Sequence, residues 1–267
     1  MSGLDFEVRQ AELDWAAYEL ATDFVLEVIT PDDLENELHI SASNKPETIE
    51  ELYLRLLESA QNANMKPQVI GGSIDGVHNL GSVLFDFDPA LVLKRFPTES
   101  DVLDEIVVEL NPRGKVNRSP ASLWPKYCRT ILSSATFLSQ FSSAEHFYEW
   151  VGFFDNEQAR LALPLLVAQE VDGLGFALAC DFLKGLGYEN FSKPDVHIKT
   201  IFPALRLCPP KVSDYSVFKA VDRVARNAEV SPYKVDKLFW LVGSRAFGGR
   251  RDEFIAKAKR KLRRFHA

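Results

Sequence analysis

The sequence predicts a mainly α-helical protein. Three observations lead to this prediction. Apolar residues recur at intervals of three and four through most of the chain, strand-like alternation is scarce, and residues that start or end helices stand between the apolar runs. With 267 residues, 46% of them apolar, the chain can form one large domain or two ordinary domains with their own cores.

The first part of the chain is expected to be acidic and helical. The stretches 15–29 and 46–64 have helical spacing, and Pro46 suits the N-terminus of the second helix. Glycines interrupt the pattern in 66–96, where Asp88 followed by a proline starts another helix. Because 66–96 lacks the glycine spacing of a phosphate-binding loop, we expect a structured loop there.

Helical spacing continues in the second part of the chain. A serine pair ahead of Glu145 predicts one helix cap, and Pro232 suits the first turn of another helix. The expected helices cover 121–141, 142–154, 156–171, 215–230, 231–247 and 252–267.

The charge changes sign along the chain. Residues 1–110 carry 6 Lys and Arg against 23 Asp and Glu, a net charge of −17, whereas 111–267 carry 25 against 15, a net charge of +10. The segment 111–120 holds two prolines, a glycine and basic residues, which suits a hinge. We therefore predict an acidic region 1–110, a basic hinge 111–120 and a region 121–267 that ends in a basic helix.

The cysteine content excludes a disulfide framework. Cys128, Cys180 and Cys208 are widely spaced and odd in number, so they suit free thiols in a reducing compartment. No apolar run approaches the roughly 18 residues of a membrane span, and the first residues lack the pattern of a signal peptide. We expect a soluble cytoplasmic protein.

Residues 171–202 combine two glycines with a Pro-Asp pair. A backbone that reverses between two helices at Gly173 and Gly175 needs positive φ angles, which glycine adopts at little cost. Leu174 between them is expected to fill the hairpin. Such a hairpin presents backbone N–H groups at a helix N-terminus, where an anion such as a DNA phosphate binds well.

This hairpin resembles that of the helix-hairpin-helix (HhH-GPD) DNA glycosylase superfamily. The residues V-D-G-L-G-F-A-L-A from Val171 to Ala179 are similar to the family pattern L-P-G-V-G-x-K-x-A, and Asp195 lies 18 residues after Ala177, at the family's essential aspartate. The resemblance covers about 120–245 and implies a helical DNA-glycosylase-like fold.

The resemblance also implies a set of functional residues. Asp195 would be the catalytic carboxylate, and the carbonyls of Val171 and Gly173 would hold a monovalent cation, K+ or Na+, with no other cofactor. Double-stranded DNA would be the partner, so that the protein associates with the nucleoid when bound. The residues expected to contact DNA are Gly173, Leu174, Gly175, Ala177, Lys184, Lys193 and Lys199.

The chain departs from the family pattern at several points. Ala177 occupies the position of the Schiff-base lysine, which predicts a monofunctional hydrolase without lyase activity, unless Lys184, Lys193 or Lys199 substitutes through an unusual geometry. Only 35 residues lie between Ala135 and Val171, so the helical barrel is abbreviated or is completed by the acidic N-terminal half. The four cysteines of an iron-sulfur cluster are absent from the sequence.

The sequence allows two interpretations of Asp195. Cleavage of an N-glycosidic bond places positive charge on deoxyribose, which a fixed carboxylate stabilises while it orients a water. Alternatively, Asp195 only caps the next helix, and the protein is a non-catalytic DNA-binding protein whose acidic half modulates binding or contacts a protein partner. Asp172, in place of the hairpin proline, is expected to cap locally and to repel phosphate slightly. His197 lacks a second ligand at metal spacing, which favours a hydrogen-bonded structural role.

A glycosylase must also extrude the target base into a pocket with aromatic or apolar walls. Most aromatic residues at helical spacing belong to the core. The candidates for the pocket are Trp124, Phe137, Phe141, Tyr148, Trp150 and Trp240.

The basic C-terminal stretch 245–267 has nine Lys and Arg against two acidic residues. A basic amphipathic helix of this kind binds nucleic acid, an anionic membrane or the acidic half of its own chain. The sequence leaves these three partners open.

Overall fold

The computed structural model describes residues 3–40, 45–62, 69–156, 159–244 and 248–265. Over these residues the chain is helical and no strand occurs, which confirms the predicted mainly α class. The chain divides into two compact units, here called the terminal unit (Met1–Ser43 with Gly187–Ala267) and the central unit (Asn44–Leu186). Among the described helices, none is both long enough and apolar enough to cross a membrane.

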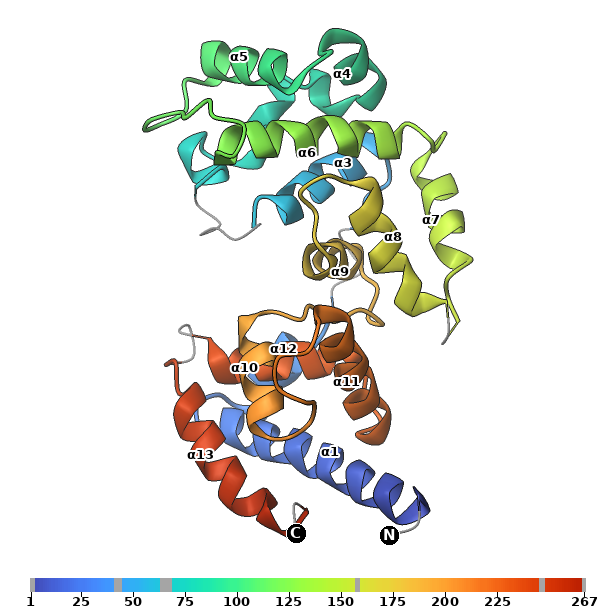
Figure 1. Ribbon diagram of the computed structural model, residues 1–267, viewed down its shortest axis with the longest axis vertical. Helices are drawn as coiled ribbons and strands as arrows, with labels where there is room; N and C mark the ends of the chain where they lie inside the picture. Colours follow the sequence, from blue (N-terminus) through green and yellow to red (C-terminus); the bar gives the residue numbers. More distant parts are fainter. Residues whose placement is uncertain (1–2, 41–44, 63–68, 157–158, 245–247, 266–267) are drawn as a thin grey trace. The chain divides into compact units, whose positions relative to one another are not determined.

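The terminal unit joins the first helix of the chain to the last ones. Helix α1 contacts α11, α12 and α13, which are seen around it in Figure 1. Its inward stripe includes Ala17 and Ala21, both fully buried, whose small side chains allow close helix packing. The helices of this unit are α1 (Gly3–Leu26), α2 (Pro31–Glu37), α10 (Val196–Ala204), α11 (Asp214–Asn227), α12 (Pro232–Gly243) and α13 (Arg251–Lys261), followed by the 3-10 turn η7 (Leu262–Phe265).

The central unit is organised around α6. This helix contacts α3, α4, α5 and α8, and α3 also contacts α9. Two buried tyrosines link α3 to α6, because Tyr53 donates its hydroxyl hydrogen to Ile131 O at 2.7 Å and Tyr127 donates to Leu57 O at 2.9 Å. The helices are α3 (Ile49–Ala60), α4 (Pro89–Arg95), α5 (Glu99–Leu110), α6 (Leu123–Leu138), α7 (Ala144–Gly152), α8 (Leu163–Glu170) and α9 (Phe176–Gly185), with 3-10 turns η2 (Gly71–Ser73), η3 (Val77–Ser82), η4 (Phe85–Phe87) and η5 (Arg160–Ala162).

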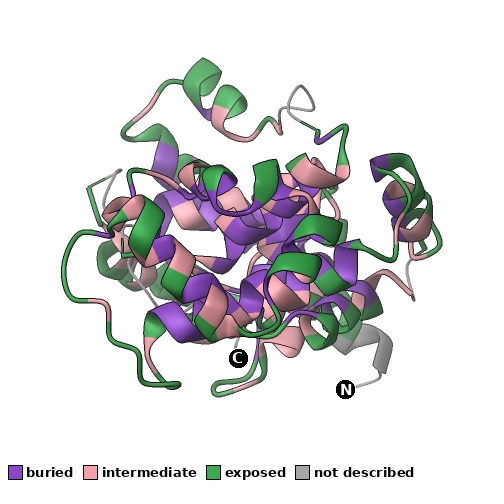
Figure 2. Cartoon of the chain, turned by 90° about the horizontal axis from the view of Figure 1, so that it is seen from above, coloured by how far each residue is buried: buried purple, intermediate pink, exposed green. Residues whose placement is uncertain are grey.

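Most predicted helix starts are confirmed by their caps. Asp88 accepts hydrogen bonds from the first N–H groups of α4, Ser143 caps α7, and Pro232 is the first residue of α12. Helix α3 differs, because Thr48 rather than Pro46 precedes its first turn and accepts from Glu51 N. Figure 2 shows buried and exposed residues alternating along the helices, as amphipathic spacing requires.

The boundaries between the two units differ from the domain boundaries that the sequence predicts. The predicted hinge 111–120 lies inside the central unit, and the predicted acidic region 1–110 is split between both units. The physical reason is packing: α3, α4 and α5 bury their apolar faces against α6, which follows the hinge. Residues 44–110 of the acidic half therefore form part of the central unit.

Candidate functional site

The glycine hairpin connects α8 to α9 in the central unit. Gly173 has a φ of +82°, as predicted, whereas Gly175 has a φ of −72° and needs no left-handed conformation. Leu174 is 2% exposed and donates its N–H to Val171 O at 3.1 Å, so it fills the turn as expected. Gly173 and Gly175 are exposed, and Gly175 precedes α9 without a side-chain cap. The first backbone N–H groups of α9 are therefore not capped by a side chain of Gly175.

The hairpin is anchored on α6. Asp172 N donates to Ser133 Oγ at 3.0 Å, and Arg129 Nε donates to the Asp172 carboxylate at 3.2 Å. A Cβ on Gly173 would lie 2.6 Å from Thr130 Oγ1, so this position also requires a residue without a side chain. Because Arg129 is itself basic, it offsets the negative charge that Asp172 brings to the hairpin.

Asp195 caps α10 in the terminal unit. Its Oδ1 accepts from His197 N at 2.8 Å and from Ile198 N at 3.0 Å. Within the described parts of the chain, no donor reaches Oδ2. The side chain is partly exposed, so one carboxylate oxygen is held by the helix and the other is open to a ligand or water.

His197 departs from its predicted hydrogen-bonded role. Its Nδ1 is buried and finds no hydrogen-bond partner among the described residues. The ring lies against the end of α12, where a Cβ on Gly243 would approach Nδ1 to 2.3 Å. His197 is the second residue of α10, and its side chain is thus positioned by packing rather than by hydrogen bonds.

The three candidate lysines have different surroundings. Lys184 Nζ lies 3.7 Å from the carboxylate of Asp181, one turn earlier on α9. Lys199 Nζ donates to Asp214 Oδ1 at 2.9 Å, and Lys193 donates its backbone N–H to buried Asp236 at 2.9 Å. None of these three contacts links a lysine to Asp195.

The aromatic candidates belong to both units. Phe137, Phe141 and Trp150 pack with Phe147 between α6 and α7, with ring centroids 5.2 to 6.4 Å apart. Such edge-to-face and tilted packing is typical of a core cluster. The other three are Trp124, buried against Tyr127; Tyr148, whose hydroxyl donates to Pro46 O; and Trp240 of the terminal unit, near Lys237.

The acidic and basic ends of the chain pair within the terminal unit. Glu27, the residue after the end of α1, accepts hydrogen bonds from Lys257 and from Arg250, which lower the pKa of its carboxyl. Glu37 of α2 pairs with Lys237 at 2.8 Å. Part of the basic C-terminal stretch therefore binds the acidic N-terminal region of its own chain, one of the three predicted partners.

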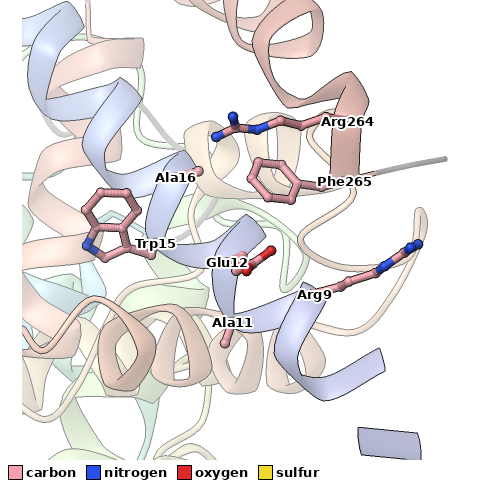
Figure 3. A pocket seen from close by; sticks show the side chains of 7 residues that line it. All are labelled: Arg9, Ala11, Glu12, Trp15, Ala16, Arg264 and Phe265. Carbon is pink, nitrogen blue, oxygen red and sulfur yellow. The ribbon is translucent and has the colours of Figure 1, made fainter. Parts of the chain in front are cut away.

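The structure reveals a groove that the sequence reasoning missed. It has a volume of about 700 Å³ and lies beside α1 and η7, where Trp15 and Phe265 contribute aromatic rings (Figure 3). The sequence could have indicated only that Trp15 is exposed, because Glu12 and Glu19 occupy the same helical face.

Comparison with known proteins identifies the fold. No protein family model matches the chain, and no curated protein matches its sequence. The structure is similar to the crystal structure of the Methanocaldococcus jannaschii 8-oxoguanine glycosylase/lyase in complex with 15mer DNA containing 8-oxoguanine, with a TM-score of 0.53 and 14% identity over 83% of this chain and 94% of that chain. The chain therefore has the fold of a helical DNA glycosylase.

Proposed function

We propose that the protein is a monofunctional DNA N-glycosylase, which removes a damaged or modified base by hydrolysis in base excision. One observation carries the proposal. In a fold similar to that of a DNA glycosylase, Asp195 starts α10 with one carboxylate oxygen held by two N–H groups and the other without a described donor. A carboxylate of this kind suits the positive charge that develops on deoxyribose.

Asp195 would act by position and charge. The two N–H groups hold Oδ1, so the carboxylate keeps its orientation without reorganising during the reaction. Its open oxygen would stabilise the sugar cation and orient the water that attacks the anomeric carbon. The C–N bond breaks, the base leaves with the bonding electron pair, the water oxygen forms the new C–O bond, and the proton that the water loses ends on the departing base.

The hairpin would hold the DNA backbone. Gly173 and Gly175 are exposed at the start of α9, where backbone N–H groups suit a phosphate. The carbonyls of Val171 and Gly173 would bind K+ or Na+, whose charge would offset that of the phosphate. Val171 O accepts one hydrogen bond, from Leu174 N, which leaves its second lone pair available to such a cation.

We propose that the protein lacks lyase activity because no lysine stands at the position of the family's Schiff-base lysine. Ala177 carries a methyl group, which cannot form a Schiff base. Lys184 and Lys199 each contact a neighbouring carboxylate, that of Asp181 and that of Asp214, so both amino groups are engaged in ion pairs. The similar Methanocaldococcus jannaschii protein is named a glycosylase/lyase, so this chain would perform only the first of the two steps.

A panel of duplexes that each carry one lesion tests the proposal. Oxidised purine, alkylated purine, deaminated base and mismatch substrates are incubated with the full-length protein, and strand breaks are scored with and without hot alkali. We expect breaks only after alkali. Breaks without alkali, together with a covalent adduct trapped by borohydride, would contradict the monofunctional proposal, and no breaks on any duplex would contradict the glycosylase proposal.

A second candidate function is DNA binding without catalysis. The capping geometry of Asp195 favours it, because a helix cap alone explains both hydrogen bonds to Oδ1. The two functions differ in the response to Asp195→Asn. A glycosylase would lose base release and keep equal or higher DNA affinity, whereas a binding protein would show no base release in either form.

A further inference from the structure

Trp15 occupies an unusual position on α1. The exposed face of this helix carries Glu12, Glu19 and Asp23, as expected for a surface that faces water. Trp15 lies on the same face and is 52% exposed. The core of the terminal unit gains little from a side chain in this place, which suggests a role in binding.

The groove beside Trp15 combines aromatic, basic and acidic groups. Figure 3 shows Trp15 on one side, with Phe265 and Arg264 on the other side and Glu12 between them. The Arg264 guanidinium lies 4.7 Å from the centroid of the Phe265 ring, and Arg9 contributes a second guanidinium to the lining. Flat rings beside guanidinium groups are the surfaces on which unpaired bases stack.

A strongly basic surface adjoins this groove. Phe254 and Ala258 of α13 and Leu262 of η7 recur every four residues and are buried, which directs the remaining side chains outward. Arg250 and Lys257 pair with Glu27, but the last cations contact no acidic side chain within the described ranges. These exposed residues are Lys259, Arg260, Lys261, Arg263 and Arg264.

We infer that this groove binds single-stranded nucleic acid. A base would stack on Trp15 or Phe265, the backbone phosphates would contact the five exposed cations, and the Glu12 carboxylate would accept hydrogen bonds from exocyclic amino groups of the base. A single strand fits better than a duplex, because its bases are free to leave their neighbours and stack on protein side chains. The inference goes beyond the glycosylase proposal, since it involves neither Asp195 nor a lesion.

Fluorescence anisotropy tests the inference with the full-length protein. The probe is a fluorescein-labelled, lesion-free single strand of mixed sequence, compared with the same strand annealed to its complement. We expect preferential binding of the single strand, which Trp15→Ala weakens by about tenfold, the effect of losing one stacked base. The variant Arg263→Gln/Arg264→Gln should also reduce the slope of log affinity against log salt concentration by about 1.4.

Matched controls separate stacking from charge and folding. Phe153 is 79% exposed in the central unit, so Phe153→Ala removes an exposed aromatic ring outside the groove and should leave affinity unchanged. Circular dichroism melting checks that Trp15→Ala is folded. An equal loss of affinity in Trp15→Ala and Phe153→Ala would overturn the inference. Tighter binding of the duplex than of the single strand, or binding only to anionic vesicles, would also overturn it. Base release from lesion duplexes by folded Trp15→Ala is measured in parallel, so that failure of either proposal is recognised separately.

Discussion

Asp14 of α1 and Arg223 of α11 form a two-point ion pair, with Oδ2 to Nε at 2.7 Å and Oδ1 to Nη2 at 3.0 Å. The Asp14 side chain is fully buried, and it also accepts hydrogen bonds from Gln10 and Asn227. A residue of the acidic N-terminal helix is thereby paired with a basic residue more than 200 positions later. This arrangement stabilises the terminal unit by joining the two ends of the chain.

Removal of the Asp14 carboxylate should destabilise the protein. Asp14→Ala leaves Arg223 without its partner, and we expect the free energy of unfolding to fall by about 3 kcal/mol. Urea denaturation followed by circular dichroism measures the change. The control Asp23→Ala removes an exposed carboxylate from the same helix and should change stability by less than about 0.5 kcal/mol. Similar losses in both variants would contradict a special role for the ion pair.

The cap and the charge of Asp195 can be separated. Asp195→Asn keeps an oxygen that accepts from His197 N and Ile198 N, whereas Asp195→Ala removes the cap and should lower the free energy of unfolding by about 1 kcal/mol. Both variants should release base about 100-fold more slowly or not at all, because both lack the negative charge. Wild-type rates in Asp195→Asn would show that Asp195 is a cap only.

Alanine substitutions of the two hairpin glycines should have different effects on stability. Gly173→Ala places a methyl group 2.6 Å from Thr130 Oγ1 at a φ of +82°, and we expect a loss of about 1–3 kcal/mol in stability together with weaker DNA binding. Gly175→Ala meets no atom within 4 Å and has a φ of −72°, so its stability should match the wild type within about 0.5 kcal/mol. Thermal melting and DNA titration of both variants check this order.

The contact between His197 and Gly243 should influence the helix that carries Asp195. In Gly243→Ala, a Cβ 2.3 Å from Nδ1 would force His197 to move, so we expect a loss of about 1–3 kcal/mol in stability and slower base release. The double variant His197→Ala/Gly243→Ala removes the clash and should lose less stability than the sum of the single variants. Gly152→Ala, with no atom within 4 Å of the added Cβ, is the control.

The thiols should differ in reactivity. Burial raises the pKa of Cys128 to about 12 and also raises that of Cys208, where nearby Arg223 opposes the shift. Since the thiolate reacts, Cys208 should be labelled before Cys128 by a thiol reagent at mildly alkaline pH. Stability should fall as the pH rises above 9.0, the ordinary value for Cys128, because the unfolded state then loses a proton that the folded state retains. Mass spectrometry of partially labelled protein tests the order.

Local patterns predicted much of the fold. Periodic apolar residues, Ser143, Asp88 and Pro232 indicated helices and their starts, because caps and amphipathic faces depend on residues a few positions apart. The positive φ of Gly173 was likewise expected from the need to reverse the chain. The start of α3 was misplaced by a few residues, since Thr48 rather than the proline formed its cap.

The candidate site was less accessible to sequence reasoning. The spacing between the hairpin and Asp195 pointed to the fold, and the similarity in structure agrees with it. The unpartnered Nδ1 of His197 could not be anticipated, because its environment depends on Gly243 from another helix. The groove at Trp15 was missed for the same reason: Phe265 completes it from the opposite end of the chain.

By itself, the sequence determined the helical class, the glycine turn and a carboxylate placed to cap a helix, because these follow from backbone sterics and local hydrogen bonding. Only the tertiary structure decided which helices pack together. It divided the chain at residues 43 and 186 rather than in the segment 111–120, and it paired Asp14 with Arg223. Long-range packing depends on burying complementary faces and charges that have no fixed separation in the sequence, so local patterns carry little information about it.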